Sequence, residues 1–185
     1  MTARILNGVA IRDQIYAELQ TEIASLAAGG VRPGLAAVLV GDNPASKLYV
    51  NSKIAACGKL GLESFSVTPP ATITTEELLG VVGELNRREE VDGILVQMPL
   101  PKQVDSKRIL DAIDPAKDVD GFHPLNAGRL ARGLPGLVPA TPLGCLRLAK
   151  TVHHSLAGLE AVVIGRSNIV GKPVTQLLLA ENATV

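Results

Sequence analysis

Short apolar runs alternate with longer amphipathic stretches along this chain. The run at 34–41, GLAAVLVG, lies between turn residues and is too short for a buried helix, which favours a buried parallel strand. Residues 62–67 and 93–96 predict two more strands. Helical patterns cover 7–28, 44–60 and 74–88, the last with Thr74 and Glu77 at capping-box spacing. This alternation predicts an α/β fold built on a parallel sheet.

A second set of elements follows a stretch rich in glycine and proline. Residues 120–139 predict a crossover or hinge rather than a core element, so we place a domain boundary there, between domains of residues 1–119 and 120–185. Beyond it, 143–152 predicts a helix, 160–164 a strand and 170–180 another helix. Residues 181–185 resemble the end of a helix followed by the first residues of a new strand. We therefore expect either that the natural chain continues beyond Val185 or that this sequence is a fragment of a longer protein.

The charge and composition exclude several classes of protein. Eighteen basic and eighteen acidic residues cancel, which argues against nucleic acid or an anionic membrane as partner. No window approaches the roughly 20 apolar residues of a spanning helix, and the charged start does not fit a signal peptide, so we expect a soluble cytoplasmic protein. Cys57 and Cys145 have no partners at metal-ligand spacing, which predicts two buried, reduced thiols and no metal site.

Tyr49 and Lys53 lie four residues apart on the predicted helix 44–60, so their side chains share one face. A partly buried lysine beside a phenol can work as a proton carrier. The pair alone is a weak signal, because a half-buried tyrosine above a solvated lysine is common on any helix.

Gln97 ends the predicted strand 93–96 abruptly with an amide. Parallel pairing would place this strand beside the one that ends at Gly41, whose loop leads into the Tyr49 helix. The three side chains can therefore converge on one cleft, where the amide would fix a water or a substrate heteroatom. The alternative is an ordinary strand-end residue that bonds to the backbone.

Lys117, Asp118 and Asp120 crowd before a Gly-Phe turn. Carboxylates at such places often only close Asx-turns. One that faces a cleft can instead bind a heterocycle with adjacent N–H donors, as bidentate recognition requires. His123, close by, is better explained as a structural turn residue.

The stretch GRSNIVGKP at 165–173 follows a predicted strand and opens a predicted helix. That context is typical of a nucleotide-binding turn, in which glycine allows close approach and helix-start amides bind phosphate. Ser167 replaces the second glycine of a strict motif, while Arg166 and Lys172 add charge that suits a phosphorylated ligand. A turn without any ligand is the alternative.

Taken together, these segments resemble the bifunctional methylenetetrahydrofolate dehydrogenase/methenyltetrahydrofolate cyclohydrolase family. The segments that carry the resemblance are PASKLYVNSK, DGILVQMPLP, DPAKDVDGFHPLNAGRL, ATPLGC and VVIGRSNIVGKPV. The resemblance implies a parallel-sheet catalytic domain followed by the start of a Rossmann-like NADP-binding domain. It also implies a homodimeric enzyme of one-carbon metabolism, which oxidises 5,10-methylenetetrahydrofolate with NADP and hydrolyses the product to 10-formyltetrahydrofolate.

The same resemblance assigns roles to particular residues. Lys53 is similar to the essential polar group of the folate cleft, with Gln97 positioning its amine, Tyr49 stacking on the folate and Asp120 binding the pterin ring. Gly165, Arg166 and Ser167 are similar to the loop that contacts NADP.

The sequence departs from the family in lacking its C-terminal third, including later nucleotide-domain strands and a final helix. Two other interpretations therefore stay open. One is a truncated, non-catalytic folate-binding or assembly fragment, and the other is a different nucleotide-dependent α/β enzyme with a coincidental cleft.

Overall fold

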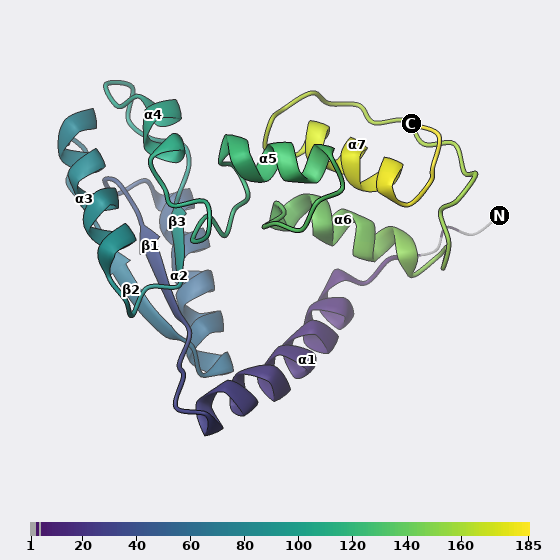
Figure 1. The fold of residues 1–185 in the computed structure, drawn as a ribbon, viewed down its shortest axis with the longest axis horizontal. Coiled ribbons are helices and arrows are strands. Elements are labelled where there is room, and N and C mark those ends of the chain that lie inside the picture. Colours follow the sequence, from purple (N-terminus) through teal and green to yellow (C-terminus); the bar gives the residue numbers. More distant parts are fainter. Residues whose placement is uncertain (1–2, 4) are drawn as a thin grey trace. The chain divides into compact units, whose positions relative to one another are not determined.

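The computed structural model describes residue 3 and residues 5–185 (Figure 1). The helices are α1 (Gly8–Ala28), α2 (Pro44–Leu60), α3 (Thr75–Arg87), α4 (Ser106–Asp111), α5 (Pro124–Ala131), α6 (Ala140–Lys150) and α7 (Gly171–Ala180). The strands are β1 (Gly34–Val38), β2 (Glu63–Val67) and β3 (Gly93–Val96). The predicted alternation of helix and strand is confirmed in the first two thirds of the chain.

The chain divides into two compact units. One comprises residues 16–119, and the other comprises residues 120–185 together with the described residues up to Ile15, so that α1 runs from one unit into the other. A domain of residues 1–119 stays a prediction, since compactness groups its first residues with the second unit.

The three strands form one parallel sheet in the order β2-β1-β3. Ala36 in the central strand is in register with Phe65 of β2 and Ile94 of β3. The predicted parallel sheet is therefore confirmed, and so is the pairing of the strand before Gln97 with the strand before Gly41. Regular pairing in β1 stops at Val38, short of the predicted Gly41.

Successive residues of the sheet face different helices, because side chains alternate along a strand. Ala36, Val38, Ile94 and Val96 pack in one apolar core with Leu78, Val82 and Leu85 of α3 and with Ile109 of α4. Ala37, Leu39 and Leu95 pack on the opposite face with Val50 and Ile54 of α2. Both faces of β1 and β3 are covered, which explains why these two strands are continuous apolar runs, whereas the edge strand β2 has polar, exposed residues between its apolar ones.

Capping residues fix both ends of helix α2. The Asn43 side chain accepts hydrogen bonds from the backbone N–H groups of Ala45 and Ser46, at 3.0 and 3.2 Å, which satisfies donors that have no partner within the helix. Gly61 ends the helix with a left-handed φ of 82° and donates to the carbonyl of Cys57. The helix that carries Tyr49 and Lys53 is thus fixed at both ends.

Two predictions for the second unit are wrong. The supposed crossover at 120–139 contains α5, which His123 caps by accepting from Leu125 N at 3.1 Å and which Pro124 opens. The predicted strand at 160–164 is not regular, since Glu160 makes an isolated bridge to Thr184 while Val162 and Ile164 are 89% and 99% exposed. Apolar β-branched residues predict a strand only where a neighbouring strand pairs with them.

The cysteines differ from the expectation of two buried thiols. Cys57 is buried in α2, and this burial raises the pKa of its thiol, which disfavours the reactive thiolate. Cys145 of α6 is exposed, and it lines a groove together with Val174 and Leu177 of α7. Within the described residues, no helix is both long and apolar enough to cross a membrane.

Candidate active site

The centre of the candidate site is a contact between Lys53 of α2 and Gln97 at the end of β3. Leu95 faces α2, so Gln97, two residues further along the strand direction, points to the same side. Its backbone N–H donates to Val38 O at 2.9 Å, which continues the pairing with β1. Lys53 Nζ then lies 3.5 Å from Gln97 Oε1, and both side chains are half-buried.

The Gln97 amide is oriented by the chain that follows it. Its Nε2 donates to Met98 O at 2.8 Å, so its oxygen is the atom presented to Lys53. An ammonium has three donors, and the 3.5 Å contact is at the long limit for a hydrogen bond, so this contact leaves Lys53 donors for another acceptor. The sequence did not indicate that the Met98 carbonyl orients the Gln97 amide, because every residue type has a backbone carbonyl.

Tyr49 lies one helical turn before Lys53, and 65% of it is exposed. An open aromatic ring beside a lysine offers a flat apolar surface with a polar edge, which suits stacking against a ring-shaped ligand. The structure brings Lys53 and Gln97 into contact, as expected from the pairing of the two strands, whereas the part of Tyr49 in the same site stays a prediction.

The acidic cluster divides into residues with different surroundings. Lys117 is structural, since its Nζ donates to Asn86 O and Arg88 O at 2.9 and 2.8 Å. Asp118 is 1% exposed and pairs with Ile94 beside β3, so it belongs to the core of the first unit. Asp120 is half-buried and begins the second unit, and its place relative to Lys53 stays a prediction.

The predicted nucleotide loop, residues 165–170, is tied to the start of α7 by Ser167. The Ser167 hydroxyl accepts from Val170 N and Gly171 N, each at 3.1 Å, and its carbonyl accepts from Lys172 N at 3.0 Å. The serine therefore caps the turn where a second glycine would otherwise stand. Because the Gly171 and Lys172 amides are bonded within the turn, an anion at this helix start would have to replace Ser167 or bind elsewhere on the loop.

Gly171 lets this loop lie directly on the helix. A Cβ placed there would be 2.6 Å from both the carbonyl carbon and oxygen of Gly165 and 2.8 Å from Arg166 N, closer than real Cβ atoms come. The turn is thus compact as a nucleotide-binding turn requires. Arg166 is exposed, whereas Lys172 donates to Asn168 Oδ1 at 2.7 Å, so Arg166 is the better placed cation for a phosphate.

No metal centre is evident among residue 3 and residues 5–185, where three or more His, Cys, Asp or Glu side chains do not gather as ligands. The first unit carries an ammonium, an amide oxygen and an exposed aromatic ring on α2 and at the end of β3. The second unit carries a compact glycine-bounded turn with an exposed arginine.

Two family descriptions match this chain. Residues 6–120 match "Tetrahydrofolate dehydrogenase/cyclohydrolase, catalytic domain", and residues 139–185 match "Tetrahydrofolate dehydrogenase/cyclohydrolase, NAD(P)-binding domain". Curated relatives called "Bifunctional protein FolD" are 60% identical in Solibacter usitatus, over 98% of this chain, and 55% identical in Koribacter versatilis, over all of it. The chain spans 60% of the length of each of these relatives.

Solved structures give the same result. The bifunctional methylenetetrahydrofolate dehydrogenase/cyclohydrolase of Campylobacter jejuni has a TM-score of 0.95 and 45% identity, over 98% of this chain and 65% of its own. The corresponding enzyme of Trypanosoma brucei, solved with NADP and an inhibitor, has a TM-score of 0.94 and 37% identity, over 100% of this chain and 64% of its own. The likeness extends over both compact units.

Proposed function

This chain belongs to the tetrahydrofolate dehydrogenase/cyclohydrolase family, and on that premise we propose that the full-length protein is a bifunctional enzyme of folate-linked one-carbon metabolism. It oxidises 5,10-methylenetetrahydrofolate with NADP and then hydrolyses the methenyl product to 10-formyltetrahydrofolate. The observation that carries this proposal is the 3.5 Å contact between Lys53 Nζ and Gln97 Oε1, with Tyr49 exposed one turn away.

Lys53 is the proton carrier of the hydrolytic step. Water adds to the cationic methenyl carbon and the added water loses one proton, which gives a neutral hydroxyl intermediate. The bond from this carbon to N5 then breaks as N5 takes up a proton, while the hydroxyl loses its remaining proton to solvent and becomes the formyl carbonyl. An amine beside the reacting carbon can receive the first proton and return one to N5. The Lys53 donors not committed to Gln97 can also hold the attacking water by hydrogen bonding.

Gln97 is the positioning residue for Lys53. Its Nε2 is committed to Met98 O, so its oxygen faces the lysine and holds the amine on the side of the sheet edge where Tyr49 is open. Placing a reacting group before the substrate arrives removes part of the entropic barrier of the reaction.

Tyr49 and Asp120 bind the substrate rings. The exposed Tyr49 ring stacks on the folate, and the Asp120 carboxylate accepts two parallel hydrogen bonds from adjacent N–H donors of the pterin. The domain of residues 1–119 would then hold most of the folate, with Asp120 at its boundary with the nucleotide domain of residues 120–185.

Gly165, Arg166 and Ser167 hold NADP. When bound, NADP supplies the hydride acceptor for the methylene carbon. The compact turn at Gly171 fits such a ligand because it keeps bulk away from the loop backbone, and the exposed Arg166 guanidinium suits a phosphate group. We further propose that the full-length protein is a cytoplasmic homodimer.

Binding and turnover measurements on the full-length protein test this proposal. Titration with a folate analogue and with NADP should show saturable binding of both, and NADP-dependent oxidation of methylenetetrahydrofolate should be followed by loss of the methenyl absorbance. Folate binding without either reaction would instead support a non-catalytic folate-binding protein. NADP binding without folate binding would support a different nucleotide-dependent enzyme.

A further inference from the structure

The segment after Gln97 is held by side chains rather than by secondary structure. Residues 98–105 lie between β3 and α4 and form neither helix nor strand. Gln103 Nε2 donates to Ala71 O at 2.7 Å and to Ile73 O at 3.1 Å, and Val104 is buried. The chain that leads away from Gln97 is therefore anchored to the loop that precedes α3.

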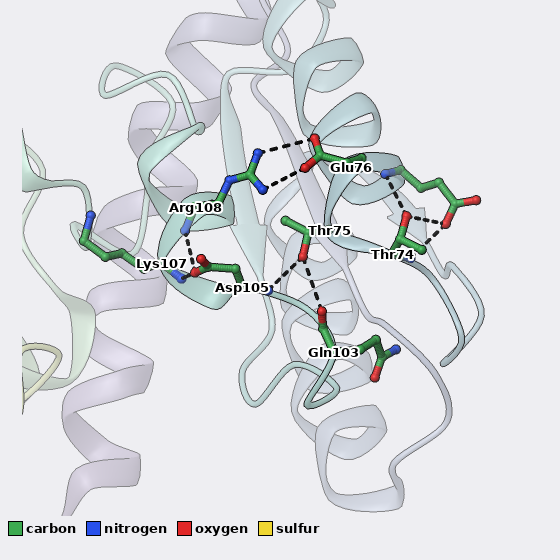
Figure 2. Close-up of polar contacts among 8 residues, drawn as sticks. Thr74, Thr75, Glu76, Gln103, Asp105, Lys107 and Arg108 are labelled. Carbon is green, nitrogen blue, oxygen red and sulfur yellow. Dashed lines mark hydrogen bonds and ion pairs between the residues drawn. The ribbon is translucent and has the colours of Figure 1, made fainter.

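Thr75, at the start of α3, makes the second anchor. Its Oγ1 accepts from Asp105 N at 2.9 Å and donates to Gln103 O at 3.4 Å, so one hydroxyl bridges two residues of the segment (Figure 2). Because the capping box of Thr74 and Glu77 holds the first turn of α3 in place, this hydroxyl fixes the far end of the segment relative to α3.

An ion pair reinforces the same junction. Arg108 of α4 contacts both carboxylate oxygens of Glu76 in the first turn of α3, at 2.7 and 3.3 Å (Figure 2). Asp105 accepts from the backbone N–H groups of Lys107 and Arg108 and so caps α4. The starts of α3 and α4 are thus joined twice, by the ion pair between Arg108 and Glu76 and by the hydrogen bond between Asp105 N and Thr75.

The loop that receives Gln103 also contacts the chain that leads to Lys53. Pro69 O accepts from Gly41 N at 2.9 Å, and a Cβ at Gly41 would lie 3.0 Å from the Ala71 Cβ. Helix α2 begins three residues after Gly41. Gln103 therefore links the segments that follow the two paired strands, one bearing Gln97 and the other leading to Lys53.

We propose that Thr75 and Gln103 are positioning residues that set the distance between Gln97 and Lys53. The Lys53 Nζ to Gln97 Oε1 contact is 3.5 Å, at the long limit of a hydrogen bond, so a shift of a few tenths of an ångström in residues 97–105 makes or breaks it. This inference rests on the proposed function of the Lys53 and Gln97 pair. It adds to the candidate active site two residues that position other side chains and do not themselves react.

Hydroxyl substitutions in the full-length protein test the role of Thr75. Thr75→Val keeps the shape but removes both hydrogen bonds, and we expect the kcat of methenyl hydrolysis to fall about 5- to 10-fold, with KM changing less than about 2-fold. Thr75→Ser restores the hydroxyl and should restore kcat. Gln103→Glu keeps the length but removes the N–H donors, and should act as Thr75→Val does.

A double-mutant cycle separates positioning from a merely structural role. If Thr75 acts through Gln97, then Thr75→Val should change kcat by less than about 2-fold in a Gln97→Ala background, because the interaction it supports is already absent. Equal effects in both backgrounds would overturn the proposal. Lys107→Ala, which removes an exposed ion pair to Asp111 on the same helix, is the matched control and should leave kcat unchanged.

Amide hydrogen exchange gives a reading that does not require activity. In Thr75→Val, exchange in residues 97–105 should become at least about 10-fold faster while the β1 and β3 amides keep their protection. Unchanged exchange would also overturn the proposal. A different outcome is faster exchange in Thr75→Val together with no hydrolysis of methenyltetrahydrofolate by the wild-type protein. That result would refute the proposed function but would still support the anchoring of residues 97–105 by Thr75.

Discussion

Gly171→Ala tests whether the compact turn at residues 165–170 is a cofactor loop. The new methyl group would come within 2.6 Å of the Gly165 carbonyl and 2.8 Å of Arg166 N, whereas ordinary contact begins at 3.4 Å. All of these neighbours are backbone atoms, so no flexible side chain can move aside. The loop must therefore retreat from α7 by about 0.8 Å, and overpacking of this kind typically costs about 1–3 kcal/mol.

The displaced loop should weaken NADP binding. If the cost of about 1–3 kcal/mol is incurred only when the loop adopts its NADP-binding conformation, binding should weaken roughly 5- to 150-fold, since each 1.4 kcal/mol is a tenfold change. If the cost instead destabilises the folded state, the Tm should fall by roughly 2–4 °C per kcal/mol. Isothermal titration with NADP and thermal unfolding of the full-length protein measure the two parts.

Gly144→Ala is the matched control in the same unit. Gly144 lies inside α6 with no atom within 4 Å of its would-be Cβ, so alanine should raise stability by about 0.5–1 kcal/mol without changing NADP affinity. The reasoning would be refuted if Gly171→Ala bound NADP with wild-type affinity and unfolded at the wild-type temperature.

Three further predictions concern the first unit. Leu78→Ala removes a side chain with no exposed surface and should lower the free energy of unfolding by about 2–5 kcal/mol in urea, whereas Leu48→Ala, on the exposed side of α2, should change it little. Thr74→Ala removes the cap of α3 and should lower stability by about 1 kcal/mol in the same assay. Hydrogen bonds from the Thr74 N–H and hydroxyl hold the pKa of Glu77 below its ordinary value of 4.5, so its contribution is present above that value and is lost as the pH falls through the lower, folded pKa. Unfolding curves at decreasing pH should therefore lose less stability in Glu77→Gln than in the wild type; an identical acid dependence would contradict this.

Local signals were sufficient to predict the first unit. The short apolar strands are flanked by turn residues, Asn43 and Gly61 bound α2, and the Thr74 and Glu77 spacing marks the start of α3, so local and tertiary preferences agree there. The convergence of Lys53 and Gln97 followed from parallel pairing and the alternation of side chains along β3. Both depend only on periodicity and strand order.

The second unit was harder to predict, because its elements depend on partners distant in sequence. Pro124 begins a helix, although the surrounding glycines and prolines suggested a crossover. Val162 and Ile164 have strand-forming side chains but lack a pairing ladder in the described part of the chain. The anchoring by Gln103 was equally hidden, since its acceptors are the backbone carbonyls of Ala71 and Ile73, which carry no sequence signal.

The most direct test of the account is the turnover of methenyltetrahydrofolate by the Lys53→Ala variant of the full-length protein, measured together with its affinity for a folate analogue. Loss of a positioned proton carrier predicts at least about a 100-fold fall in kcat, with folate affinity retained within a few-fold because Tyr49 and Asp120 are still present. Hydrolysis by Lys53→Ala at close to the wild-type rate would contradict the central claim that the contact between Lys53 and Gln97 is the catalytic centre.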